Sequence, residues 1–250
     1  MIHYHGYYRL IVDIVRGLRL NFGLFKIKSA RKANKRFEIP IIDNEIFGAL
    51  NSSDISSHLS LLYFLVRLLN PSNLVELGTR EGQSTRALRH AANELGIRGI
   101  SIDLSPTPSG FVKNHGKWVH FQEDDIEFAT KLRSEEFRKK VLGSNSIDFL
   151  FIDTSHEYLH TKQEIESYWP FLSKKSLIVL HDTNLSVSKK LDVDGRIYSG
   201  WNNSRGVTKA VEEFFDILID EKSVFSKSKG DYVFYHLPWA NGILFILKNR

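Results

Sequence analysis

A strand, a glycine turn, a helix and a second strand follow one another between residues 73 and 104, and this run constrains the fold more than any other segment. The strand pattern NLVEL leads into a turn enclosed by Gly78 and Gly82. A helical pattern follows over residues 83–95, and GISID is the second strand. Such a unit is the building block of a parallel sheet covered by helices, so the sequence predicts an open α/β fold.

The glycine turn also predicts a ligand. Glycines let the backbone approach a bound molecule, and the start of the following helix presents free N–H groups. Asp103, at the end of the second strand, is placed to accept hydrogen bonds from ribose hydroxyls. Arg80 and Ser84 stand where close approach to a pyrophosphate favours small residues, which argues against a nicotinamide dinucleotide. The alternative is a turn that needs glycine only for its geometry, with Asp103 capping a loop.

Two further apolar strands, over residues 147–152 and 177–180, each end in polar residues. Asp153 and His156 follow the first strand, and His181 and Asp182 follow the second. Because parallel strands present their carboxyl ends at one edge of the sheet, the four side chains are expected to converge. Two carboxylates suit a hard cation such as Mg²⁺, and a histidine there can accept a proton near neutral pH. The alternative is that the histidines satisfy backbone groups and the aspartates cap turns.

These motifs resemble those of a known family. The spacing of Glu76, Gly78 and Gly82 resembles the first motif of class I S-adenosylmethionine-dependent methyltransferases. The runs DTSHEY and LHDT resemble the subgroup of metal-dependent sugar O-methyltransferases and cephalosporin hydroxylase-like proteins, over roughly residues 58–250. The resemblance implies a Rossmann-like, doubly wound, seven-stranded sheet that is mostly parallel with an antiparallel C-terminal strand.

The resemblance also implies roles for individual residues. His156 would be the catalytic base, S-adenosylmethionine the cofactor and Mg²⁺ a metal bound by Asp153, His181 and Asp182. His181 replaces an acidic residue of the subgroup and leaves the site one negative charge poorer, so a further oxygen would come from Thr183 or Asn184. The cofactor-binding residues would be Glu76, Gly78, Thr79, Gly82, Ser84, Asp103, Asp124, Asp125 and Asp153. For Asp124 and Asp125 the alternative is N-capping of the next helix.

Charge separates the chain into two parts, with an N-terminal helical extension and linker over residues 1–50 and the cofactor-binding domain over residues 51–250. Residues 1–36 carry nine Lys or Arg and one acid, whereas the rest of the chain is slightly acidic. The basicity is therefore poor support for nucleic-acid binding. An amphipathic pattern within residues 8–36 is compatible with peripheral contact with an anionic membrane, and equally with packing on the domain or on a second copy. No membrane span is expected, so we expect a cytoplasmic or membrane-peripheral protein.

The leading hypothesis is an O-methyltransferase acting on a hydroxyl of a small molecule or glycan, most simply a sugar. A loop over residues 184–205, with Tyr198 and Trp201, is a candidate for stacking on the acceptor. The competing hypothesis is a catalytically inactive module that binds a membrane or partner through its basic extension. His58 heads an apolar helix and is expected in the core. The absence of cysteine excludes a disulfide framework and thiolate chemistry.

Overall fold

The computed structural model of the protein describes residues 55–106, 117–185, 189–191, 197–199 and 205–248. The helical elements are η1 (Ser56–His58), α3 (Leu59–Leu69), α4 (Gln83–Leu95), α5 (Asp125–Lys131), α6 (Glu135–Leu142), α7 (Tyr158–Tyr168), η2 (Trp169–Phe171) and α8 (Gly206–Phe215). The strands are β1 (Asn73–Leu77), β2 (Arg98–Asp103), β3 (Trp118–Gln122), β4 (Ile147–Ile152), β5 (Leu172–His181), β6 (Lys189–Leu191), β7 (Ile197–Ser199), β8 (Phe225–Lys229), β9 (Tyr232–Leu237) and β10 (Ile243–Lys248).

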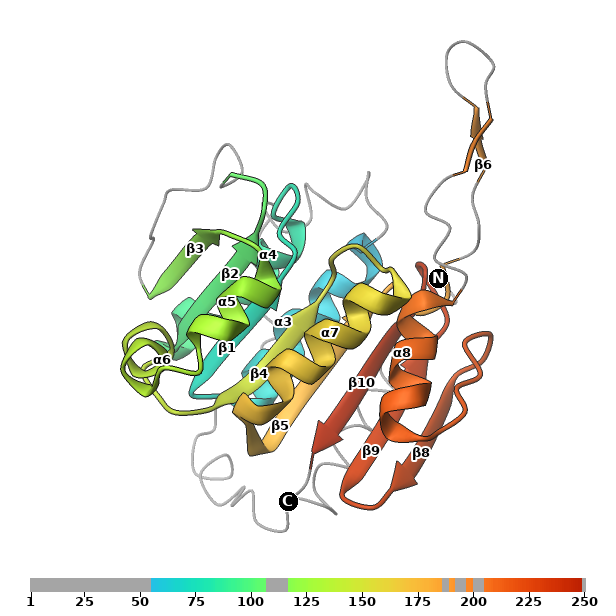
Figure 1. The fold of residues 1–250 in the computed structure, drawn as a ribbon. Helices are drawn as coiled ribbons and strands as arrows, with labels where there is room; N and C mark the ends of the chain where they lie inside the picture. The colour runs from blue at the N-terminus through green and yellow to red at the C-terminus, as the bar shows by residue number, and fades with distance from the viewer. Residues whose placement is uncertain (1–54, 107–116, 186–188, 192–196, 200–204, 249–250) are drawn as a thin grey trace, which may run out of the picture.

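An eight-stranded sheet in the order β3-β2-β1-β4-β5-β10-β9-β8 forms the centre of the described structure (Figure 1). Strands β3, β2, β1, β4 and β5 are parallel, and β10, β9 and β8 continue the sheet with antiparallel pairings. The predicted Rossmann-like class and its antiparallel C-terminal end are confirmed. The sheet has one strand more than the seven expected, because β8, with the polar sequence FSKSK, lacks the apolar alternation by which strands are recognised.

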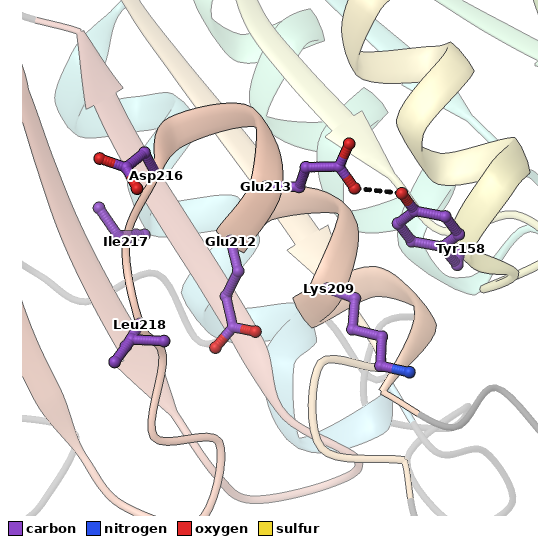
Figure 2. Close-up of a pocket in the computed structure, with 7 residues that line it drawn as sticks. All are labelled: Tyr158, Lys209, Glu212, Glu213, Asp216, Ile217 and Leu218. Carbon is purple, nitrogen blue, oxygen red and sulfur yellow. Dashed lines mark hydrogen bonds between the residues drawn. The ribbon is translucent and has the colours of Figure 1, made fainter.

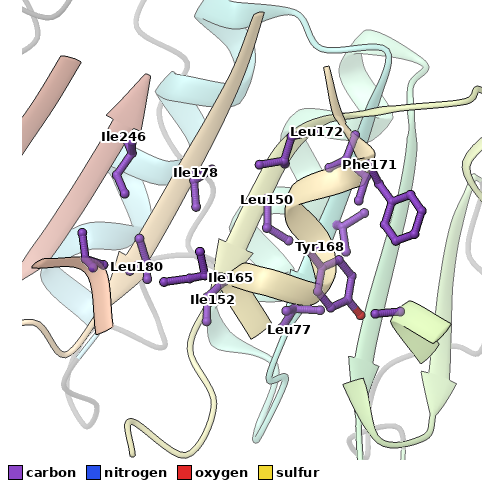
Figure 3. Close-up of a cluster of buried hydrophobic side chains, with 14 of the residues drawn as sticks. Leu77, Leu150, Ile152, Ile165, Tyr168, Phe171, Leu172, Ile178, Leu180 and Ile246 are labelled. Carbon is purple, nitrogen blue, oxygen red and sulfur yellow. The ribbon is translucent and has the colours of Figure 1, made fainter. Parts of the chain in front are cut away.

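Two hydrophobic cores lie on opposite faces of the sheet. Helices α3 and α4 cover one face, and α5, α7 and α8 cover the other (Figure 1). Strand β4 contributes to both cores. Phe149 and Phe151 belong to the first core, and Leu150 and Ile152 belong to the second, which is drawn in Figure 3. Burial on both faces explains why β4 reads as a continuous apolar run.

Several predictions from the sequence fall at or beyond the limits of the described residues. The extension over residues 1–50, with its helical pattern within 8–36, lies outside them, as do Trp201 and the side chain of Tyr198. The buried helix expected at residues 58–69 is confirmed as α3. Among the described helices, none has the length and apolar character needed to cross a membrane.

Candidate active site

The four polar side chains that follow β4 and β5 converge, as the sequence predicts. Nε2 of His156 lies 3.1 Å from Oδ1 of Asp153 and 2.9 Å from Oδ2 of Asp182. Nδ1 of His181 lies 3.2 Å from Oδ1 of Asp153 and 3.4 Å from Oδ1 of Asp182. All four residues are buried. Each aspartate therefore contacts both histidines, and we call these four residues the Asp–His cluster.

The contacts of His181 determine how its ring is oriented. Its Nε2 lies 3.1 Å from the carbonyl oxygen of Ala240, which can only accept a hydrogen bond, so Nε2 carries a proton. Its Nδ1 then faces the two carboxylates. Burial opposes the charged form, but Asp153 and Asp182 raise the pKa of His181 well above its usual value. Without a cation in the cluster, the ring is an imidazolium that donates from both nitrogens.

Burial and opposite charges also set the pKa values of the other three members of the cluster. Burial opposes the charged form of His156, but hydrogen bonds with Asp153 and Asp182 raise its pKa to about 9. Burial likewise opposes ionisation of the aspartates, but His181 and His156 hold the pKa of each carboxyl below its usual value. At neutral pH the isolated cluster therefore pairs two carboxylates with two imidazolium groups. In this state His156 holds a proton rather than accepting one.

Two members of the cluster have strained backbones. His156 has φ +61° and Asp182 has φ +57°. This left-handed conformation is unfavourable for any residue other than glycine, and it persists only where the surrounding structure holds it. The first residue of α8 is part of those surroundings, since a Cβ on Gly206 would lie 2.4 Å from the carbonyl oxygen of His156. The close packing of α8 thus helps to fix the loop that carries His156.

His58 supports the cluster from η1. Its ring meets the ring of His181 edge-on at 5.6 Å, and its Nε2 lies 2.9 Å from the carbonyl oxygen of Trp239. Burial and the neighbouring His181 lower the pKa of His58 to about 4, so it is neutral at physiological pH. The expected core position is confirmed, but its contact with His181 could not be read from two histidines 123 positions apart.

The additional oxygen ligand expected from Thr183 or Asn184 stays a prediction, and the structure gives both side chains other partners. The hydroxyl of Thr183 lies 2.9 Å from Nε2 of His236. Oδ1 of Asn184 accepts a hydrogen bond from Nζ of Lys222, and its Nδ2 donates to the carbonyl of Pro238. Both side chains are therefore committed to neighbouring strands and loops rather than to the Asp–His cluster.

The glycine turn packs directly against the Asp–His cluster. Gly78 has φ +85°, and a Cβ there would lie 2.0 Å from the carbonyl oxygen of Asp153. Oδ2 of Asp103 accepts hydrogen bonds from the backbone N–H groups of Thr79, at 2.5 Å, and Arg80, at 2.9 Å. Asp103 therefore caps the turn, as the alternative interpretation expected. Its contact with ribose stays a prediction.

Comparisons with known proteins agree with this geometry. Residues 75–183, which contain the turn and the whole Asp–His cluster, match a family described as the methyltransferase domain. Among curated proteins, the chain is 30% identical over 131 residues to the uncharacterized protein y4gI of Sinorhizobium fredii (strain NBRC 101917 / NGR234). That match covers 49% of this chain but only 14% of the longer relative.

Solved structures share the fold at low sequence identity. Cofactor-bound Rv0187 from MTB is 12% identical with a TM-score of 0.56, and the match covers 85% of this chain and 93% of that one. The methyltransferase PaMTH1 of Podospora anserina, bound to S-adenosylhomocysteine (SAH), is 14% identical with a TM-score of 0.53 and 79% coverage of both chains. The described part of this chain thus shares its fold with these proteins.

Glu76 lies inside the segment that matches the methyltransferase family, beneath the glycine turn. Its side chain is fully buried and accepts hydrogen bonds from the hydroxyls of Ser84, Thr85 and Ser101, so it ties β1 to α4 and β2. Burial raises the pKa of Glu76 to about 7, although the three hydroxyls oppose this shift. The direct cofactor contacts expected of Glu76 and Ser84 stay predictions, and the structure shows a packing role for both.

Replacing Glu76 with glutamine should flatten the pH dependence of stability. In the unfolded chain Glu76 loses its proton near pH 4.5, whereas in the folded chain it keeps the proton until about pH 7. The unfolding free energy of the wild type should therefore fall between these values, by about 3 kcal/mol in total. Urea unfolding at pH 5 and pH 8 measures the effect. Equal pH dependence in the wild type and Glu76→Gln would contradict the buried, protonated carboxyl.

The two acidic residues after β3 have different roles. Oδ1 of Asp124 accepts hydrogen bonds from the backbone N–H groups of Ile126 and Glu127, at 2.9 and 3.0 Å, so Asp124 is the N-cap of α5. Asp125 is buried, and its Oδ2 lies 3.2 Å from Nε2 of His160. The capping interpretation is confirmed for Asp124 and wrong for the side chain of Asp125. Contact of either residue with adenine stays a prediction.

A surface hollow of about 570 Å³ lies between the start of α7 and α8 (Figure 2). Tyr158 and Glu213 are hydrogen-bonded across one side of it, and Ile217 and Leu218 line another. None of its lining residues belongs to the Asp–His cluster or to the glycine turn. The hollow is therefore separate from the candidate active site.

Proposed function

We propose that this chain transfers the methyl group of S-adenosylmethionine to a hydroxyl oxygen of a small molecule or glycan. One observation carries the proposal, namely the contact of the glycine turn with the Asp–His cluster through Gly78 and the backbone of Asp153. It brings a site suited to a nucleoside-containing cofactor next to a set of proton-transfer groups. A methyl donor and an acceptor hydroxyl bound there would lie close together.

The sulfonium of S-adenosylmethionine supplies an activated methyl group, so the protein has two tasks. It must align the acceptor oxygen with the methyl carbon, and it must take up the hydroxyl proton. His156 is the proposed base, because its imidazole is fixed between two carboxylates that stabilise its protonated form. The ring must lose its proton before it can act.

The residues proposed to hold a divalent cation meet only some of the requirements of such a site. Asp153, His181 and Asp182 each offer a ligand atom, and these atoms lie within 4.8 Å of one another. The Nε2–H of His181 donates to Ala240, the kind of outer contact that orients a metal-binding imidazole, and leaves Nδ1 facing the carboxylates. A bound Mg²⁺ would lower the pKa of the acceptor hydroxyl. The imidazole makes the donor set less suited to Mg²⁺ than three oxygens would be.

The acceptor class rests on the sequence motifs alone. The runs DTSHEY and LHDT resemble those of sugar O-methyltransferases, which favours a sugar or glycan precursor. Contact of residues 8–36 with an anionic membrane, and self-association, are further proposals that follow from the charge and amphipathic pattern of that segment.

Calorimetric titration with SAH tests the proposed cofactor. Micromolar binding is expected, and Asp103→Asn should weaken it by about tenfold or more because the amide loses a charged acceptor for ribose hydroxyls. Asp148→Asn is the matched control, since Asp148 lies at the other end of the sheet on β4 and accepts a hydrogen bond from the backbone of Ser72.

The titration also separates the two functions considered from the sequence. Absence of SAH binding by the wild type, with and without Mg²⁺, would contradict the methyltransferase proposal. Vesicles containing anionic lipid would then be the next probe, because an inactive module that uses its basic extension should bind them less tightly as salt increases.

A further inference from the structure

A second group of ionisable side chains lies between α5 and α7, outside the Asp–His cluster. Nε2 of His160 is 3.2 Å from Oδ2 of Asp125 and 3.7 Å from Oε1 of Glu164. Each of the three residues offers a ligand atom, and these atoms lie within 4.8 Å of one another. A single imidazole nitrogen is therefore aimed between two carboxylates that come from different helices.

The two carboxylates are buried and only partly satisfied. Glu164 is 0% exposed and Asp125 is 7% exposed. Oε1 of Glu164 accepts a hydrogen bond from the hydroxyl of Thr154, but among the described residues neither Oε2 of Glu164 nor Oδ1 of Asp125 has a donor. The hydroxyl of Tyr168 donates to the backbone carbonyl of Asp125 rather than to its carboxylate. Buried carboxylate oxygens without donors are costly, so a bound cation would stabilise these two oxygens.

We propose that Asp125, His160 and Glu164 form a binding site for a divalent transition-metal ion such as Zn²⁺ or Co²⁺. One nitrogen and two carboxylate oxygens are a donor set that such ions accept. The ion would neutralise both carboxylates and offset the cost of burying their unpaired oxygens. The His160 side chain is 28% exposed, which gives an ion and its remaining water ligands a route from solvent.

The pKa of Glu164 also favours a cation at this site. Burial, followed by the nearby charge of Asp125, raises the pKa of Glu164 well above its usual value. Ionisation of Glu164 beside Asp125 is thus unfavourable unless a positive charge, on His160 or on a metal ion, compensates it. The metal would replace the proton that Glu164 otherwise holds.

A metal at this site would connect parts of the fold that matter for the candidate active site. Asp125 begins α5, whereas His160 and Glu164 lie on α7. Thr154, the hydroxyl partner of Glu164, directly follows Asp153 in the loop after β4. The ion would therefore cross-link two helices and stiffen the loop that bears the Asp–His cluster.

The test is metal titration of the EDTA-treated full chain carrying Asp182→Asn, which weakens the other candidate metal site. Zn²⁺ should bind with one equivalent, Co²⁺ should give visible absorption bands, and Zn²⁺ should raise the melting temperature by linkage. Adding His160→Ala should weaken binding by at least about tenfold and remove the Zn²⁺-dependent shift. These readouts do not depend on methyl transfer.

His90→Ala in the same background is the matched control. His90 also lies near a carboxylate on one helix, with Nε2 3.2 Å from Oε1 of Glu94, but that pair is on the surface. This variant should bind Zn²⁺ like its parent. Equal Zn²⁺ affinity after His160→Ala, or no Zn²⁺ or Co²⁺ binding at submillimolar concentration by the parent, would overturn the proposal. The latter result would assign the site to a protonated Glu164.

Discussion

Replacing His156 with asparagine should reduce methyl transfer by a factor of about 10² to 10⁴, with little change in SAH affinity. Asparagine tolerates the left-handed backbone that His156 adopts at φ +61°, and its amide can still donate to Asp153 or Asp182. It cannot accept the proton of an acceptor hydroxyl. Single-turnover rates and SAH calorimetry on the same preparations separate the two effects. An unchanged rate for His156→Asn would remove His156 from the role of base.

The pH dependence of the wild-type rate gives a second test of the same assignment. Because the pKa of His156 is about 9 and only the neutral ring accepts a proton, the rate without divalent cations should rise with pH up to about 9. His156→Asn should lack this rise. A cation bound to Asp153 and Asp182 would compete for their negative charge and move the inflection to lower pH.

Replacing Gly78 with alanine should be the most damaging single change in the glycine turn. The new Cβ would lie 2.0 Å from the carbonyl oxygen of Asp153, and φ at this position is +85°. The turn and the end of β4 would have to separate, so we expect a loss of at least about 3 kcal/mol in unfolding free energy from combined backbone strain and overpacking. SAH binding should fall with it, because the same turn is the proposed cofactor site.

Gly96→Ala separates backbone strain from steric overlap. Gly96 caps α4 with φ +66°, and a Cβ there meets no atom within 4 Å. This variant should lose only about 1 to 2 kcal/mol, from the left-handed conformation alone. Urea unfolding of both variants gives the comparison. Equal losses would show that the contact between the turn and Asp153 does not constrain the fold.

Much of the candidate site could be predicted because the order and direction of the strands determine where its residues lie. Once β1, β4 and β5 are recognised as parallel strands, Gly78, Asp153 and His181 must emerge at the same edge of the sheet. The closing antiparallel pair β9 and β10 was also predictable, since its strands are long and apolar. In each case the apolar pattern of the strands and the direction of the chain were sufficient for the prediction.

Other features depend on contacts that sequence spacing does not encode. Asp125 and His160 meet only because α5 and α7 pack side by side, and nothing in either helix identifies its partner. Thr183 and Asn184 look like extensions of the polar run after β5, but their hydrogen bonds turn them toward His236, Lys222 and Pro238. Side-chain direction at a strand end is decided by neighbours that are distant in sequence.

The hydrogen bond between His181 and the carbonyl of Ala240 limits which fragments of this protein could keep the Asp–His cluster in place. The matched family segment ends at residue 183, yet the carbonyl that orients His181 lies in the turn between β9 and β10, and His58 packs on the same ring from before β1. A fragment restricted to residues 75–183 would contain every residue of the Asp–His cluster but would lack two of the groups that hold it in place. The smallest autonomous unit is therefore set by these outer contacts and extends on both sides of the segment that defines the family.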